Sequence, residues 1–205
     1  MAVMRIKSQW FQQGATRTPA QTASAMAFIT WRVAQNMLKQ MRSAHFDIEI
    51  GAQYFAFTRE VLVFLIQVLD RMAHERMDMA SRGAFMSALV QRVAQVLQEN
   101  EDGLLGEPAA GQASHYERFI DQYNALSDHY ADFGFGPLGP DFSFVRYLGH
   151  RIEALMQEKD RLWVVDQIMA TEVPEAVSIL QRSMLDVLNT EPRAPRRSRT
   201  AATGD

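Results

Sequence analysis

The sequence predicts an all-α fold: a single-domain bundle of about six or seven helices around a buried long central helix. The first observation behind this prediction is the run 61–69, in which Gln67 is the one polar residue among nine. The second is that apolar residues recur at helical spacing in segment after segment, whereas no segment shows the alternation of a strand. At 205 residues the chain can bury a core without staples.

We expect the central helix to run from about residue 52 to residue 79. At 100° per residue, its polar positions Glu60, Gln67, Arg71 and Asp78 fall into one narrow seam, and most of the remaining circumference is apolar. A membrane-spanning helix needs about 20 apolar residues, so the nine-residue run is too short to span. A helix that is apolar nearly all round is instead one that other helices surround.

Capping residues predict where the neighbouring helices begin. Thr18 followed by Pro19 is a typical helix start, and Ser81 is expected to cap the third helix. Ser114 and Glu117 form the capping-box pattern, and Asp141 is expected to cap a helix after a Gly/Pro-rich loop over 134–140. These capping residues divide the chain into successive helices. We expect a first helix that ends near residue 41, the central helix, a third helix, an aromatic helix over 116–133 and a helix after 141.

Polar and breaker residues predict where helices end or approach each other. The polar run 98–102 is expected to lie in solvent, and 103–113 is expected to be a loop. Gly149 lies on an apolar helix face, where the missing side chain lets another helix approach closely. A short helix over 160–171 is expected to end before Pro174, which starts the last helix.

The ends of the chain differ from its body, so we divide it into an N-terminal segment 1–17, a helical domain 18–189 and a tail 190–205. The apolar pair Trp10 and Phe11 is expected to dock on the body. Four arginines against Glu191 and Asp205 give the tail a charge of +2, which leaves −5 for the rest of the net −3. Since the tail has no apolar anchor, we expect it to be disordered.

Composition excludes several classes of function. With no cysteine there is no disulfide, thiolate metal site or cysteine nucleophile. A pI near 6.0 is not the basic balance typical of nucleic-acid binding. The first residues lack the apolar run of a secretory signal, which favours a cytoplasmic location. No cofactor and no nucleic-acid partner are expected.

Histidines paired with carboxylates are the candidate metal ligands. The pairs are Asp70 with His74, His129 with Asp132, and His150 with Glu153. Helical bundles build metal sites from inward-pointing Glu-x-x-His pairs. Here the order is different and the pairs lie on polar helix faces, so solvated surface pairs are the favoured interpretation.

The aromatic helix 116–133 is the candidate wall of a ligand pocket. It carries aromatic residues along one stripe, with more aromatic side chains after it at Phe135, Phe142, Phe144 and Tyr147. An apolar pocket of this kind suits a small ligand. Core packing explains the same stripe.

The element Pro140-Asp141-Phe142 follows a Gly/Pro loop and leads into a helix. It resembles the Pro-Asp-His element of helical chaperones for bacterial molybdenum redox enzymes, which are chains of similar size. Phe142 stands where those chaperones have histidine, and the likeness covers only these few residues. It implies, as a minor alternative, a role in redox-enzyme maturation.

An excess of apolar helix surface without paired catalytic residues favours a non-catalytic interaction protein over an enzyme. Phe28 and Ile29 lie off the main stripe of the first helix, which favours a homodimer through helix faces. The alternative is a small-ligand- or metal-binding helical protein, possibly an enzyme, with its pocket near the aromatic helix.

Overall fold

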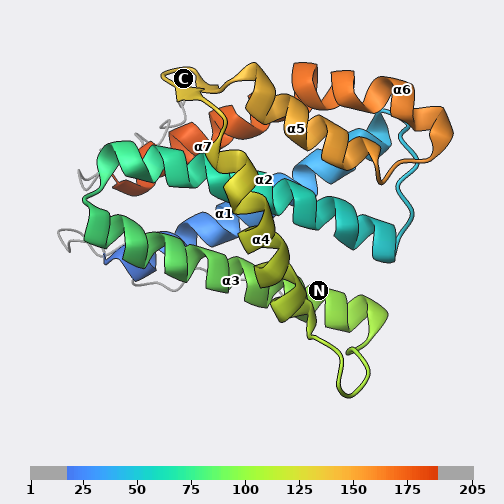
Figure 1. Ribbon diagram of the computed structural model, residues 1–205, viewed down its shortest axis with the longest axis horizontal. Coiled ribbons are helices and arrows are strands. Elements are labelled where there is room, and N and C mark those ends of the chain that lie inside the picture. The colour runs from blue at the N-terminus through green and yellow to red at the C-terminus, as the bar shows by residue number, and fades with distance from the viewer. Residues whose placement is uncertain (1–17, 189–205) are drawn as a thin grey trace, which may run out of the picture.

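The structure is a computed structural model that describes residues 18–188, and this part of the chain is almost entirely helical (Figure 1). Its elements are α1 (Pro19–Ser43), α2 (Ala52–Arg76), α3 (Met79–Leu105), α4 (His115–Ala131), β1 (Phe135–Gly136), β2 (Gly139–Pro140), α5 (Phe142–Glu153), α6 (Glu158–Gln167), η2 (Ile168–Glu172) and α7 (Val173–Leu188). The strands form one short antiparallel hairpin, with Phe135 opposite Pro140. The predicted all-α single-domain fold is confirmed.

Helix α2 lies at the centre of the molecule. It contacts α1, α3, α4, α5 and α7, so other helices surround it. All residues from 61 to 69 are buried, and Leu65 and Leu69 are fully so. The apolar run therefore forms the middle of one hydrophobic core to which every α-helix contributes.

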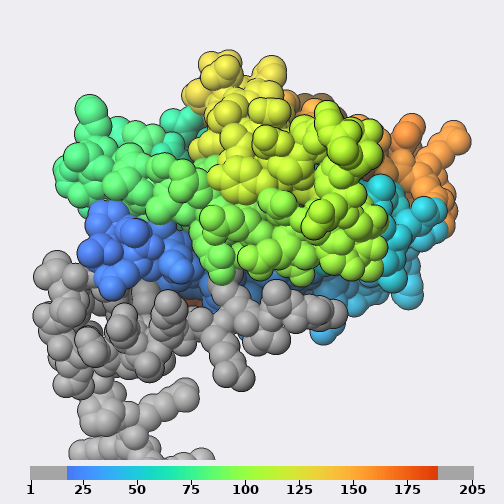
Figure 2. Space-filling view, turned by 90° about the horizontal axis from the view of Figure 1, so that it is seen from below, coloured from blue at the N-terminus to red at the C-terminus, as the bar shows by residue number. Residues whose placement is uncertain are grey.

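The polar seam of α2 faces protein, not solvent. The buried carboxylate of Glu60 accepts hydrogen bonds from Arg151 on α5 and from Gln122 on α4. Gln67 donates to Ser127, and Arg71 donates to the last carbonyls of α4. The seam therefore holds α4 and α5 against the central helix. Figure 2 shows the face that α3 and α4 form.

Three expectations for α3 are wrong. Its N-cap is Asp78, not Ser81: the Asp78 carboxylate accepts from the backbone N–H of Ser81, so α2 ends before the residue assigned to its seam. The polar end of the helix is also not wholly solvated, because Glu101 is buried against Arg59 and His115. In addition, the helix continues to Leu105, so the expected loop begins at Gly106 and not at residue 103.

The caps at Thr18, Ser114 and Asp141 are confirmed. Gly149 also acts as expected: a Cβ there would lie 3.0 Å from Val165 Cγ1, so its absence lets α6 pack closely on α5.

Pro174 does not break the chain into two helices. Instead α6, η2 and α7 follow without interruption, and the π-helical turn η2 ends at Glu172, two residues before the proline. Proline lacks an N–H and its ring clashes with the carbonyl four residues earlier in a regular α-helix. A widened π turn before Pro174 accommodates both effects, and such turns are frequent at functional sites.

Helix α2 is the one described helix that is long and apolar enough to span a membrane by length and composition. The other helices bury 72% of its most apolar window, as in the core helix of a soluble protein. The predictions for the N-terminal segment, including Trp10 and Phe11, and for the tail fall outside the described residues.

Candidate functional site

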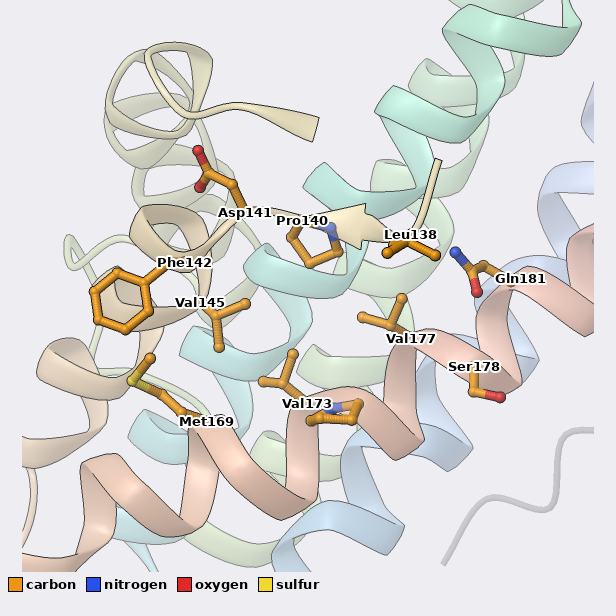
Figure 3. Close-up of a pocket in the computed structure, with 11 residues that line it drawn as sticks. Leu138, Pro140, Asp141, Phe142, Val145, Met169, Val173, Val177, Ser178 and Gln181 are labelled. Atoms are coloured by element: carbon orange, nitrogen blue, oxygen red, sulfur yellow. The ribbon is translucent and has the colours of Figure 1, made fainter. Parts of the chain in front are cut away.

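An apolar groove lies between the β1–β2 hairpin with the start of α5 on one side and η2 with α7 on the other (Figure 3). Its volume is about 460 Å³. Val145 from α5 and Val173 and Val177 from α7 form its floor, and Phe142 and Met169 lie together at one end. The groove thus joins segments about 30 residues apart in the sequence.

Asp141 fixes the geometry of the hairpin side. One carboxylate oxygen accepts from the backbone N–H of Phe144, which caps α5, and the other accepts from the N–H of Gly134 before β1. The backbone N–H of Asp141 also donates to the Gly134 carbonyl at 3.0 Å. Asp141 is the one ionisable residue lining the groove, and both of its oxygens are engaged in holding backbone. Its role is therefore structural.

Gly139 sets how closely the hairpin approaches α7. Its φ is +113°, a conformation that residues with a side chain rarely adopt, and a Cβ there would lie 3.2 Å from Val177 Cγ1. The next two positions put Pro140 and Asp141 against the groove. Glycine is needed here for both backbone conformation and space.

Two groove residues leave large apolar surfaces in water. Leu138 at the hairpin tip is 97% exposed and Phe142 is 65% exposed. The Arg146 guanidinium lies 5.8 Å from the centre of the Phe142 ring, a cation–π arrangement. Besides its apolar residues, the groove offers one engaged carboxylate, the Ser178 hydroxyl and the Gln181 amide, and it presents no nucleophile–base pair among its lining residues.

The aromatic helix mainly fills the core instead of lining a pocket. The fully buried Tyr130 packs on Phe64, Phe133, Phe144 and Tyr147 with ring centroids 4.9–6.3 Å away. Its hydroxyl has no hydrogen-bond partner, and burial, with Glu60 and Tyr147 nearby, raises its pKa well above the ordinary value.

A second cavity of about 300 Å³ does lie against the start of this helix, between α3 and α4. Tyr116, Ile120 and Tyr123 face Met86 and Val90 across it. Only the first half of the aromatic stripe lines this cavity, and its function as a ligand pocket stays a prediction.

A cluster of buried and partly buried ionisable groups connects α2, α3 and α4. His115 Nδ1 lies 2.6 Å from an Asp102 oxygen, and His115 Nε2 lies 3.7 Å from Glu101, which also pairs with Arg59. Burial is the main cause that raises the pKa of Glu101. None of these four residues lines either cavity, so they hold the corner between α3 and α4.

The six candidate metal ligands lie in three separate places. The Asp70 carboxylate accepts two hydrogen bonds from Arg82, at 2.8 and 2.6 Å, and His74 lies 3.4 Å from the same guanidinium. The bond to Asp70 is the main cause that raises the pKa of Arg82. A cation therefore already occupies the position between Asp70 and His74.

The other two pairs are on the surface. His150 meets Glu153 at 2.9 Å and receives a bond from Arg146. His129 packs against Tyr147, and Asp132 ends α4. Among residues 18–188, no group of three or more such side chains is placed to hold a metal ion.

Comparisons with protein-family models, curated proteins and solved structures give no match to this chain. The groove is therefore the feature that bears on function. The sequence indicates Phe142 as a pocket residue but not Leu138, Met169, Val173 and Val177, because nothing local connects the hairpin to α7. The one available signal was apolar residues within a Gly/Pro loop.

Proposed function

We propose that the protein is a non-catalytic interaction protein and that the groove between the β1–β2 hairpin and α7 binds an apolar segment of a protein partner. The observation that carries this proposal is the exposure of Phe142 and Leu138 beside a groove lined mainly by apolar residues. Exposed apolar groups gathered at a groove mark binding sites on soluble proteins.

The groove is suited to side chains, not to an added strand. Strand addition needs a free row of backbone N–H and C=O groups. Strand β2 has two residues, and one of them, Pro140, has no N–H to donate. Val145, Val173 and Val177 instead offer a surface for apolar side chains. An amphipathic helix with two or three apolar anchors fits this requirement.

The second candidate is a small apolar ligand in the same groove. A volume of about 460 Å³ lies within the range of ligand pockets, about 300–1,000 Å³. An enzyme would need a reactive group, and the single carboxylate there is engaged. Redox-enzyme maturation, which the Pro140-Asp141-Phe142 element implies, is the special case in which the bound chain is an immature enzyme.

Photo-cross-linking in cells tests the proposal. Benzoylphenylalanine at position 142 replaces an exposed aromatic residue by a similar one that captures whatever lies on it. The matched control is the same group at Met79, which is 89% exposed at the start of α3 and does not line the groove. The full chain is irradiated in the cells that make it, and adducts are identified by mass spectrometry.

The proposal predicts a discrete protein adduct from position 142 that position 79 does not give. An adduct of a few hundred daltons would instead support the small-ligand function. Equal, diffuse adducts at both positions would show that the groove binds nothing specific and would overturn the proposal.

A further inference from the structure

We infer that the groove receives helix α6 of a second copy of this chain, so that two copies bind reciprocally. This inference rests on the proposed function of the groove. The observation behind it is a second exposed apolar pair, Leu162 and Trp163 on α6, which are 80% and 66% exposed. Tryptophan is enriched at interface hot spots, so Trp163 is the stronger anchor of the pair, and Leu162 adds apolar area beside it.

The anchor pair and the groove lie on one continuous helical rod. Leu162 precedes the groove residue Met169 by seven residues, which is nearly two helical turns and about 10 Å along the axis. The two residues therefore lie on about the same side of the rod. An anchor beside a groove on one molecule is self-complementary: a two-fold axis inserts each anchor into the other copy's groove at once.

Both features carry charges of both signs. Glu158 and Asp166, both exposed, lie one turn before and one turn after Leu162, and the exposed Lys159 lies one turn before Trp163. At the groove, Arg146 lies beside Phe142, Arg182 follows Gln181 at the other end, and Asp141 belongs to the lining. The two acidic groups of each anchor therefore have two arginines as counterparts at the groove, and Lys159 has the Asp141 carboxylate, which favours this occupant.

The test uses purified full-length chains carrying Trp163→Ala or Phe142→Ala. Both side chains are exposed, so unchanged helical circular dichroism and melting temperature are expected. Sedimentation over a concentration series measures self-association. Met79→Ala is the control for removing an exposed apolar side chain elsewhere.

The inference predicts a wild-type dimer whose dissociation constant rises about 100-fold in each variant, because each loses an anchor contact twice at roughly tenfold per contact. An equal mixture of the two variants keeps one intact anchor–groove contact and should bind about tenfold more tightly than either alone. Weakening by added salt is also expected.

Three results would overturn the inference. The first is a 23.3 kDa monomer for the wild type at all concentrations. The second is a dimer that both variants leave intact. The third is a mixture of the two variants whose dissociation constant is no lower than that of either variant alone. This result would show that each feature contacts the same feature of the second copy, and not that the anchor enters the groove. A foreign protein cross-linked at position 142 together with a monomeric wild type would refute the second copy and keep the proposed function.

Discussion

Replacing Arg151 by leucine should destabilise the protein because it leaves the Glu60 carboxylate buried with one neutral partner. Glu60 is 4% exposed and accepts from Arg151 at 3.0 and 2.6 Å and from Gln122 at 2.9 Å. Breaking a buried ion pair costs about 3–5 kcal/mol. Because the Arg151 side chain is 41% exposed, water screens part of the interaction, and we expect about 2–3 kcal/mol.

Urea unfolding followed by circular dichroism gives the free energy of unfolding for each variant. Replacing both Glu60 and Arg151 by leucine should restore most of the loss, since apolar residues substitute well for a buried pair. The exposed pair between Lys159 and Asp47 is the control, and Lys159→Ala should leave the free energy of unfolding almost unchanged. If Arg151→Leu costs no more than this control, α4 and α5 are not held to α2 by the buried carboxylate.

Three further predictions concern the core, the π-helical turn and the helix contact at Gly149. Leu65→Ala should lower the free energy of unfolding by about 2–5 kcal/mol, because the side chain is fully buried; a loss under about 1 kcal/mol in urea would refute the central position of α2. Burial, with Glu175 nearby, raises the pKa of Glu172 above its ordinary 4.5. The native state therefore holds this proton more tightly, and stability falls as the pH rises from about 4.5 through the raised pKa. Glu172→Gln should remove part of that slope in melting curves across pH, and an unchanged slope would contradict it. Gly149→Ala should push α6 from α5 through contact with Val165 and lower the melting temperature, whereas Gly83→Ala, where no atom lies within 4 Å of the added Cβ, should not.

Local chemistry was enough to predict much of the fold. The run 61–69 is almost wholly apolar, which predicts a helix surrounded by other helices. Side-chain oxygens at Thr18, Ser114 and Asp141 cap the helices that follow them. The cap of α3 was missed because Asp78 and Ser81 are both good capping residues three positions apart. In the structure the Asp78 carboxylate accepts from Ser81, and the sequence contains no local preference between them.

Contacts between helices are not visible in the spacing of residues along the sequence. Glu101 stands in a polar run, and its burial follows from Arg59 on another helix. The candidate groove likewise depends on how distant segments pack. The burial of 61–69 also removes one argument for a dimer, because neighbours within the monomer already cover α2. Exposed apolar surface remains at Leu162 and Trp163 on α6 and at the groove with Leu138 and Phe142, and the groove exists only because the hairpin packs on α7.

Hydroxyl-radical footprinting of two native methionines tests the central claim, that a protein covers this groove, most directly. Met169 lines the groove, and Met79 lies outside it and is 89% exposed, so their ratio of oxidation is an internal measure of groove exposure. The account predicts that this ratio falls several-fold in cells, or at concentrations where the chain self-associates, relative to the dilute purified chain. An identical ratio under all three conditions would show that the groove stays open to water and would contradict the proposed function.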